Sequence, residues 1–128
     1  MKTDLIIFDL AGTLVKMRPA TLLLNITLLK KYAKKYKLAI VTSGKRTETL
    51  NILNKLNIKA FFMDSNIITK DDTNLRKPDP ELLKLAVKIC QANSPFYIGD
   101  KTKDRKMANS ANIPFIYSQK LLLSKGDL

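Results

Sequence analysis

The stretch that decides the fold is Leu5–Val15, "LIIFDLAGTLV". Its first four residues are all apolar, which is typical of a short strand buried on both faces of a sheet. Asp9 follows at once, and Gly12 then favours a tight turn. In open parallel sheets, ligands bind outside the carboxyl ends of the strands. Asp9 lies at such an end, so it is the first candidate for a functional residue.

Short apolar runs alternate with longer stretches of helical period along the whole chain, and this alternation predicts βαβ units on a parallel sheet. The expected strands are Leu5–Asp9, Leu38–Thr42, Ala60–Met63, Phe96–Gly99 and Pro114–Tyr117. The expected helices are Ala20–Tyr36, Thr47–Asn57, Pro80–Ala92, Asp104–Ala111 and Gln119–Leu123. The polar segment Asp64–Lys77 is expected to be a loop. We therefore predict a doubly wound α/β fold, in which residues 1–128 form one three-layer domain.

Two of the expected helices have informative apolar faces. In the first, Leu24 and Leu28 widen the apolar stripe, which indicates either core packing or a contact surface for a second copy of the chain. In the third, Asp79 is the expected N-cap. The residues expected to be buried there are Leu82, Leu83, Ala86, Ile89 and Cys90.

Composition excludes several kinds of chemistry. The chain has no histidine, which removes Ser-His-Asp and Cys-His catalysis and His-ligated zinc. The single Cys90 cannot form an internal disulfide and is read as a small buried hydrophobe. No apolar run is long enough to cross a bilayer, so we expect a cytoplasmic protein without membrane contact. The net charge of +12 favours polyanionic partners, nucleic acid among them, although a lysine-rich composition would produce the same charge.

Four motifs together are specific. They are "FDLAGTLV", "IVTSGK", "RKPDPE" and "YIGDKTKD", and three of them lie where a predicted strand ends. In this order the motifs resemble those of the haloacid dehalogenase-like superfamily of hydrolases. The resemblance implies a Rossmann-like sheet with the strand order 5-4-1-2-3, and Mg²⁺-dependent removal of phosphate from phosphomonoesters.

The resemblance also implies roles for individual residues. Asp9 would be the nucleophile that forms an aspartyl-phosphate, and Lys77 would neutralise the phosphoryl charge and orient Asp9. Asp100 would bind Mg²⁺ together with Asp9, and Asp104 would support the metal through water or contact Lys77. The expected substrate-binding residues are Thr42, Ser43, Gly44, Lys45 and Lys77. The electrostatics agree, since a phosphate dianion approaches a carboxylate only where cations offset the repulsion.

Ala11 departs from the family pattern, which places a second aspartate there as general acid and base. Alanine keeps the backbone carbonyl expected to bind the metal, but it removes the proton transfer. We therefore expect slow turnover through Asp9; the alternative is a catalytically silent scaffold that binds phosphate or polyanions or assembles into oligomers. The sequence leaves open whether Ala11 is natural, as in phosphonoacetaldehyde hydrolases, or a deliberate inactivating substitution.

The spacing of the motifs leaves no room for the cap domain that most relatives insert. Between Gly12 and Thr42 we expect only a flap-like turn and one helix. The open site would take a phosphorylated small molecule or a polyanion, or be closed by a second subunit in a homo-oligomer. A positive rim is expected around its mouth, formed by Arg18, Lys45, Arg46, Arg76, Lys101, Lys103 and Arg105.

Overall fold

The strand that begins the motif, β1 (Leu5–Phe8), lies in the middle of a five-stranded sheet. The computed structural model describes residues 2–123. The other strands of this sheet are β4 (Lys37–Val41), β5 (Ile67–Ile68), β6 (Pro95–Gly99) and β7 (Phe115–Tyr117). Their order is β5-β4-β1-β6-β7, and every neighbouring pair is parallel. Numbered in chain order and read from β7, this is the expected 5-4-1-2-3 arrangement, so the doubly wound α/β fold is confirmed.

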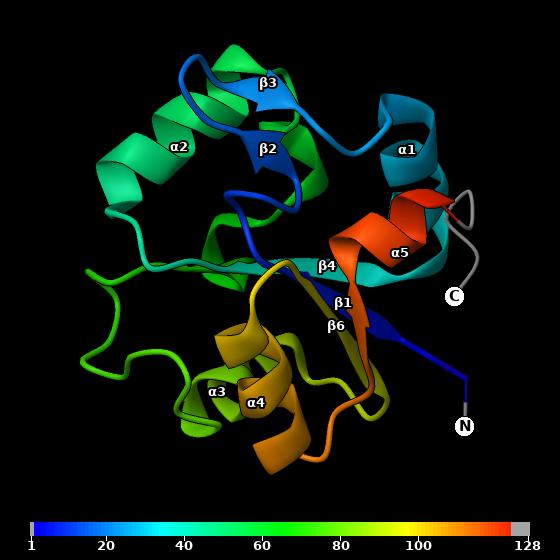
Figure 1. The fold of residues 1–128 in the computed structure, drawn as a ribbon, viewed down its shortest axis with the longest axis vertical. Helices are drawn as coiled ribbons and strands as arrows, with labels where there is room; N and C mark the ends of the chain where they lie inside the picture. The colour runs from blue at the N-terminus through cyan, green and yellow to red at the C-terminus, as the bar shows by residue number, and fades with distance from the viewer. Residues whose placement is uncertain (1, 124–128) are drawn as a thin grey trace.

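Helices cover both faces of the sheet, as Figure 1 shows. One face carries α1 (Ile26–Lys35), α2 (Arg46–Lys55) and α5 (Ser118–Leu123), and the other carries α3 (Glu81–Cys90) and α4 (Thr102–Ser110). Side chains alternate along β1, so that Ile6 and Phe8 join the core beneath α1 and α2 while Leu5 and Ile7 join the core over α3. This double burial explains the unbroken apolar run. Among residues 2–123, no helix has the length and apolar composition needed to cross a membrane.

The third strand of the sheet was predicted in the wrong place. The expected strand Ala60–Met63 forms part of the 3₁₀ turn Lys59–Phe61 and its exit, and a second such turn follows at Asp64–Asn66. The strand is β5 (Ile67–Ile68), inside the segment expected to be a loop. Phe62 contributes to the core instead, edge-on to Phe8 with ring centroids 6.2 Å apart.

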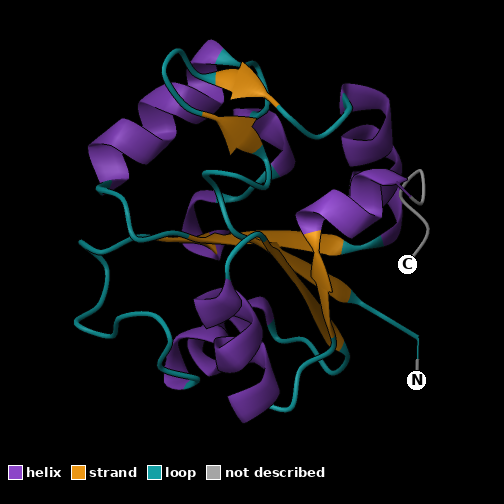
Figure 2. Cartoon of the chain, in the orientation of Figure 1, coloured by secondary structure: helices purple, strands orange, loops and turns teal. Residues whose placement is uncertain are grey.

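The first helix was predicted to begin too early. Residues of its expected first turns form β3 (Thr21–Leu22), which pairs with β2 (Val15–Lys16) in a small antiparallel hairpin (Figure 2). Helix α1 begins only at Ile26, because the Asn25 side chain caps it by accepting a hydrogen bond of 2.7 Å from the backbone N–H of Thr27. Leu24 lies before the helix and is buried in the core, so it offers no contact surface.

The boundaries of the other helices differ by one or two residues from those predicted. Pro80, not Asp79, is the N-cap residue of α3, but the Asp79 side chain accepts a 2.9 Å hydrogen bond from the Glu81 N–H and thus stabilises the same end. Ile89 was expected to be buried and is 40% exposed. Cys90 is buried, as predicted.

Two glycines allow backbone segments to approach the carboxyl ends of β1 and β6 closely. Gly12 has a φ of +86°, and a Cβ atom placed there would lie 2.0 Å from Asp100 Oδ2. At Gly99 a Cβ atom would lie 2.6 Å from the Asp104 Cβ. Glycine is therefore required at both positions for Asp100 and Asp104 to lie where they do.

We expect Gly99→Ala to destabilise the fold by about 1–3 kcal/mol, since the added methyl group must push the first turn of α4 away from β6. Gly44→Ala is the matched control, because its Cβ would meet only side-chain atoms at 3.5 and 3.6 Å, an ordinary contact. Urea unfolding of both variants measures the difference. Equal stability of the two variants would contradict the close approach at Gly99.

Candidate active site

A cavity of about 170 Å³ opens at the carboxyl ends of β1 and β4. Parallel sheets collect ligand-binding residues at this edge, and the residues after these two strands contribute to the cavity as predicted. The lining residues come from β1 and β4 ends, the β2–β3 hairpin, α2, the loop before α3, and α4. They are Asp9, Leu10, Ala11, Met17, Thr42, Ser43, Gly44, Glu48, Thr49, Ile52, Lys77, Lys101, Lys103 and Asp104.

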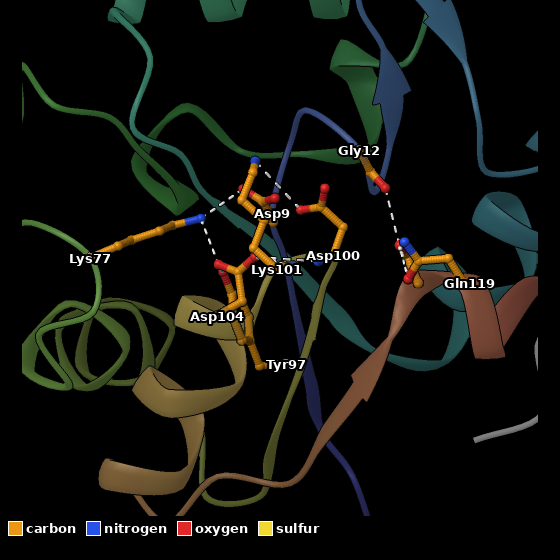
Figure 3. Close-up of polar contacts among 9 residues, drawn as sticks. Asp9, Gly12, Lys77, Tyr97, Asp100, Lys101, Asp104 and Gln119 are labelled. Atoms are coloured by element: carbon orange, nitrogen blue, oxygen red, sulfur yellow. Dashed lines mark hydrogen bonds and ion pairs between the residues drawn. The ribbon is translucent and has the colours of Figure 1, made fainter.

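Lys77 connects two carboxylates inside this site, as Figure 3 shows. Its Nζ atom lies 2.7 Å from Asp9 Oδ1 and 3.0 Å from Asp104 Oδ1. The side chains of all three residues are at least nine-tenths buried. Charge-assisted hydrogen bonds of this length are strong in such surroundings. The structure therefore brings Lys77, which is expected to neutralise the phosphoryl charge, into contact with Asp9, the expected nucleophile. It also shows the predicted contact between Asp104 and Lys77.

Asp104 is held from several directions. The Tyr97 hydroxyl donates a 2.8 Å hydrogen bond to its Oδ1 atom. The backbone N–H groups of Asp100 and Lys101 donate to its Oδ2 atom at 3.3 and 3.2 Å. This carboxylate thus fastens α4 to the end of β6 and fixes the position of Lys77.

The ionisation of the buried groups reflects this crowding. Burial raises the pKa of Asp9 to about 7, and the carboxylates of Asp100 and Asp104 add to the rise, although the Lys77 ammonium opposes it. Burial would also raise the pKa of Asp104, but Lys77 and the Tyr97 hydroxyl outweigh it and lower that pKa. Burial, with the Asp104 charge next, raises the pKa of Tyr97 well above its ordinary value. One lysine therefore does not balance the three carboxylates.

The carboxylates fit a divalent cation. Oxygen atoms of Asp9, Asp100 and Asp104 all lie within 4.8 Å of one another. Asp100 Oδ1 is buried and has no hydrogen-bond partner among residues 2–123; the Lys101 ammonium lies 3.8 Å from it. A hard cation such as Mg²⁺ prefers such oxygen donors. The predicted metal residues are thus brought together, Ala11 beside them.

The loop after β4 forms another side of the cavity. Thr42 is buried, and its Oγ1 atom accepts a 3.2 Å hydrogen bond from the backbone N–H of Gly44, which closes a tight turn. Thr42, Ser43 and Gly44 all line the cavity, as predicted. Lys45 does not: it is the exposed N-cap residue of α2. Its predicted place among the substrate-binding residues is not supported by the geometry.

Arg46 ties the loop that carries Lys77 to the beginning of α2. Its guanidinium donates to Asp72 Oδ2, to the carbonyl of Ile67 and to the carbonyl of Asp64, each at 2.9 Å. Its backbone N–H donates to Asp71 Oδ2 at 2.8 Å. Arg46 is therefore a structural clamp.

Only part of the expected positive rim reaches the cavity. Arg76, like Arg46, is engaged within the loop, where it donates to backbone carbonyls of Thr73, Leu75 and Lys70. Lys101 and Lys103 are the rim residues that line the cavity.

Sequence reasoning missed one wall of the cavity. Glu48, Thr49 and Ile52 of α2 and Met17 after β2 contribute to it. The spacing of Glu48, Thr49 and Ile52 places them on one face of a helix that starts beside Gly44. That periodicity was a usable signal. The flap-like turn expected after Gly12 contains Met17, but Met17 was not named as a residue of the site.

Comparisons with known proteins agree with this geometry. Residues 24–118 match the sequence model of the haloacid dehalogenase-like hydrolases. No curated protein matches the chain.

Solved structures share the fold over most of the chain. A provisionally named phosphoglycolate phosphatase from Lactobacillus plantarum has a TM-score of 0.82 and 20% identity, over 92% of this chain and 87% of that one. The core domain of a provisionally named phosphoglycolate phosphatase from Streptococcus pneumoniae has 28% identity and a TM-score of 0.71, over 91% and 80%. A provisionally named β-phosphoglucomutase from Thermotoga maritima has 16% identity and a TM-score of 0.76, over 98% and 100%. With more than half of its residues matched by the family model and this fold around its carboxylates, the chain belongs to the haloacid dehalogenase-like hydrolases.

Proposed function

We propose that the protein is a Mg²⁺-dependent phosphomonoester hydrolase that acts through an aspartyl-phosphate on Asp9. The observation that supports this best is the buried Asp9 carboxylate, 2.7 Å from the Lys77 ammonium and next to two further carboxylates at the mouth of a cavity. A carboxylate in this position has little reason to be buried for stability alone, since charge burial is costly. The named relatives are phosphate-handling enzymes, which agrees with a phosphorylated small-molecule substrate.

The reaction has two steps at Asp9. In the first, a carboxylate oxygen of Asp9 forms a bond to phosphorus, and the ester oxygen leaves with its electron pair. In the second, water attacks the phosphorus and releases phosphate and Asp9. Lys77 holds Asp9 and offsets the charge of the phosphoryl group, while the Thr42 hydroxyl and the N–H groups after β4 bind its oxygens.

Asp9 and Asp100 would hold the Mg²⁺ ion, together with the carbonyl of Ala11, and Asp104 would support it indirectly. A bound Mg²⁺ ion supplies positive charge that lowers the repulsion between Asp9 and the phosphate. Asp100 Oδ1, buried without a hydrogen bond from residues 2–123, is the atom that gains most from it. Asp104 accepts a hydrogen bond from the Tyr97 hydroxyl and lies 3.0 Å from Lys77 Nζ, which suits an indirect role.

Ala11 limits this chemistry. Ala11 lines the cavity, and its methyl side chain carries no proton donor or acceptor. A leaving alkoxide therefore departs without protonation, and the attacking water loses its proton without a base at this position. General acid–base catalysis of this kind contributes about 10²–10⁴-fold to turnover.

We infer further that the site has no cap domain of its own. Between Gly12 and Thr42 the chain forms only the β2–β3 hairpin and α1, followed by β4. Met17 is the contribution of this segment to the cavity. The substrate would thus enter from solvent.

The first test compares nitrophenyl phosphate with glycerol phosphate, in the chain as given, in Ala11→Asp and in Asp9→Asn. We expect Ala11→Asp to raise turnover by about 10²–10⁴-fold, and most for the glycerol ester, because an alkoxide needs a proton and a nitrophenolate does not. Asp9→Asn should abolish release of phosphate from both. Turnover that survives Asp9→Asn would contradict the nucleophile, and a lack of turnover in all three would favour the silent scaffold.

The second test concerns metal and pH. Asp9 keeps its proton up to about pH 7 in the folded protein but loses it near pH 4 when unfolded, so the metal-free protein should lose stability as pH rises from 4 through 7. Mg²⁺ relieves this cost, so it should raise the melting temperature by several degrees at pH 8 and much less at pH 5. Asp100→Asn should remove the Mg²⁺ effect, and Glu81→Gln, at an exposed carboxylate of α3, should keep it. An equal Mg²⁺ effect in both variants would contradict the site.

A further inference from the structure

We propose that the physiological substrate is a phosphoric anhydride, such as an acyl phosphate, whose leaving group departs as an anion facing Lys101 and Lys103. This inference rests on the aspartyl-phosphate chemistry of the proposed function, and it names an anhydride in place of an ester as the phosphoryl donor. Two independent features of the cavity support it. One is the lack of a proton donor for the leaving group. The other is a pair of exposed lysines at the cavity, of which Lys101 lies 3.8 Å from Asp100 Oδ1 and Lys103 has no ion pair with residues 2–123.

Three residues that line the cavity carry a carboxylate, namely Asp9, Asp104 and Glu48, and each is unsuited to protonate a leaving group. Asp9 is the nucleophile. Asp104 is fully buried and already bound to Tyr97 and Lys77. Glu48 is exposed at the first turn of α2, and no hydrogen bond or ion pair with residues 2–123 holds its side chain toward Asp9. Ala11 supplies no proton. An alcohol would therefore leave as a high-energy alkoxide, whereas a carboxylate or phosphate leaves as a stable anion.

The cations of the cavity divide into two sets. Lys77 is occupied by Asp9 and Asp104. Lys101 and Lys103 are exposed and lie at the beginning of α4, on the other face of the sheet from α2. Lys101 lies 3.8 Å from Asp100 Oδ1, and Lys103 forms no ion pair with any residue between 2 and 123. Figure 3 shows Lys101 extending toward Asp100, beside Asp9.

These lysines can stabilise negative charge that develops on the leaving group rather than on the phosphoryl group. Lys77 is held at Asp9 and Asp104, so Lys101 and Lys103 are the exposed positive charges among the residues that line the cavity. A developing carboxylate there is stabilised by their field, and the helix dipole of α4 acts in the same direction. An uncharged alcohol gains nothing from them.

The reaction balances without a proton donor. A carboxylate oxygen of Asp9 forms a bond to phosphorus, and the bond between phosphorus and the acyl oxygen breaks, with its electron pair leaving on the carboxylate. Water then attacks the phosphorus of the aspartyl-phosphate, which releases phosphate and returns Asp9, and the proton of the water passes to solvent. Because the second step lacks a base at Ala11, it is the slower one. The phosphorylated protein should therefore accumulate.

The experiment follows phosphorylation of Asp9 by intact mass after an acid quench, in the full chain with Mg²⁺. Acetyl phosphate and glycerol phosphate are the two donors. We expect phosphoprotein to form from acetyl phosphate at least about 10²-fold faster than from glycerol phosphate, the factor that a missing general acid removes from the ester. Asp9→Asn should form none.

The role of the lysines is tested by Lys101→Gln, Lys103→Gln and the double variant. Each single change should slow phosphorylation by acetyl phosphate about three- to tenfold, as expected for partly exposed charge interactions. Lys106→Gln is the matched control, because it removes the same charge from an exposed position of α4 outside the cavity, and its rate should equal that of the parent chain.

Three outcomes separate the inference from the function on which it rests. Equal rates from acetyl phosphate and glycerol phosphate, or lysine variants that behave like Lys106→Gln, would overturn the anhydride substrate and leave the proposed function intact. Phosphorylation from glycerol phosphate that Glu48→Gln removes would also overturn it, by identifying Glu48 as the missing acid. No phosphoprotein from either donor, with nitrophenyl phosphate also unreacted, would overturn the proposed function itself.

Discussion

The arrangement of the whole site depends on one buried ammonium group that lies among three carboxylates. Lys77 contacts Asp9 and Asp104 directly, and Asp100 completes the acidic group. One positive charge does not balance three negative ones in a water-poor site, so the remaining repulsion has to be offset by protonation or by a cation. The raised pKa of Asp9 reflects the tendency toward protonation, and the carboxylate oxygens are the ligands that a hard cation prefers. Other features of the region keep these groups together: the glycines at 12 and 99, the hydroxyl of Tyr97, and the N–H groups before α4.

Much of the fold and of the candidate site could be predicted from the sequence. Strands buried on both faces appear as unbroken apolar runs, and the carboxyl ends of parallel strands meet at one edge of the sheet. Asp9, Thr42 and Asp100 were found in this way, whereas the resemblance to the family pointed to Asp104. Lys77 has no comparable local signal; only the resemblance to the family pointed to it. Its position depends on contacts with Asp9, 68 residues away in the chain.

The errors have physical causes as well. The run 60–63 is as apolar as a strand, but the sheet takes the next apolar pair, Ile67–Ile68, and the earlier run packs Phe62 into the core. The helix predicted from Ala20 begins at Ile26, since Asn25 offers a better cap than any residue before it, and the preceding leucines pack into the core or the hairpin. Arg46 illustrates a third limit. Its place in the sequence is next to the turn after β4, but tertiary hydrogen bonds direct its side chain to Asp72 and to the Ile67 carbonyl.

The Arg46 clamp has a consequence for the dynamics of the molecule. The segment between β5 and α3 is irregular (Figure 2), and few apolar contacts hold such a segment, so brief openings of it cost less than global unfolding. Each opening that breaks the Arg46 contacts would carry Lys77 away from Asp9. The contact between Lys77 and Asp9 would then be governed by a local equilibrium rather than by the stability of the sheet. Amide exchange and protease cleavage within residues 69–77 would report the fraction of molecules in which this segment is open.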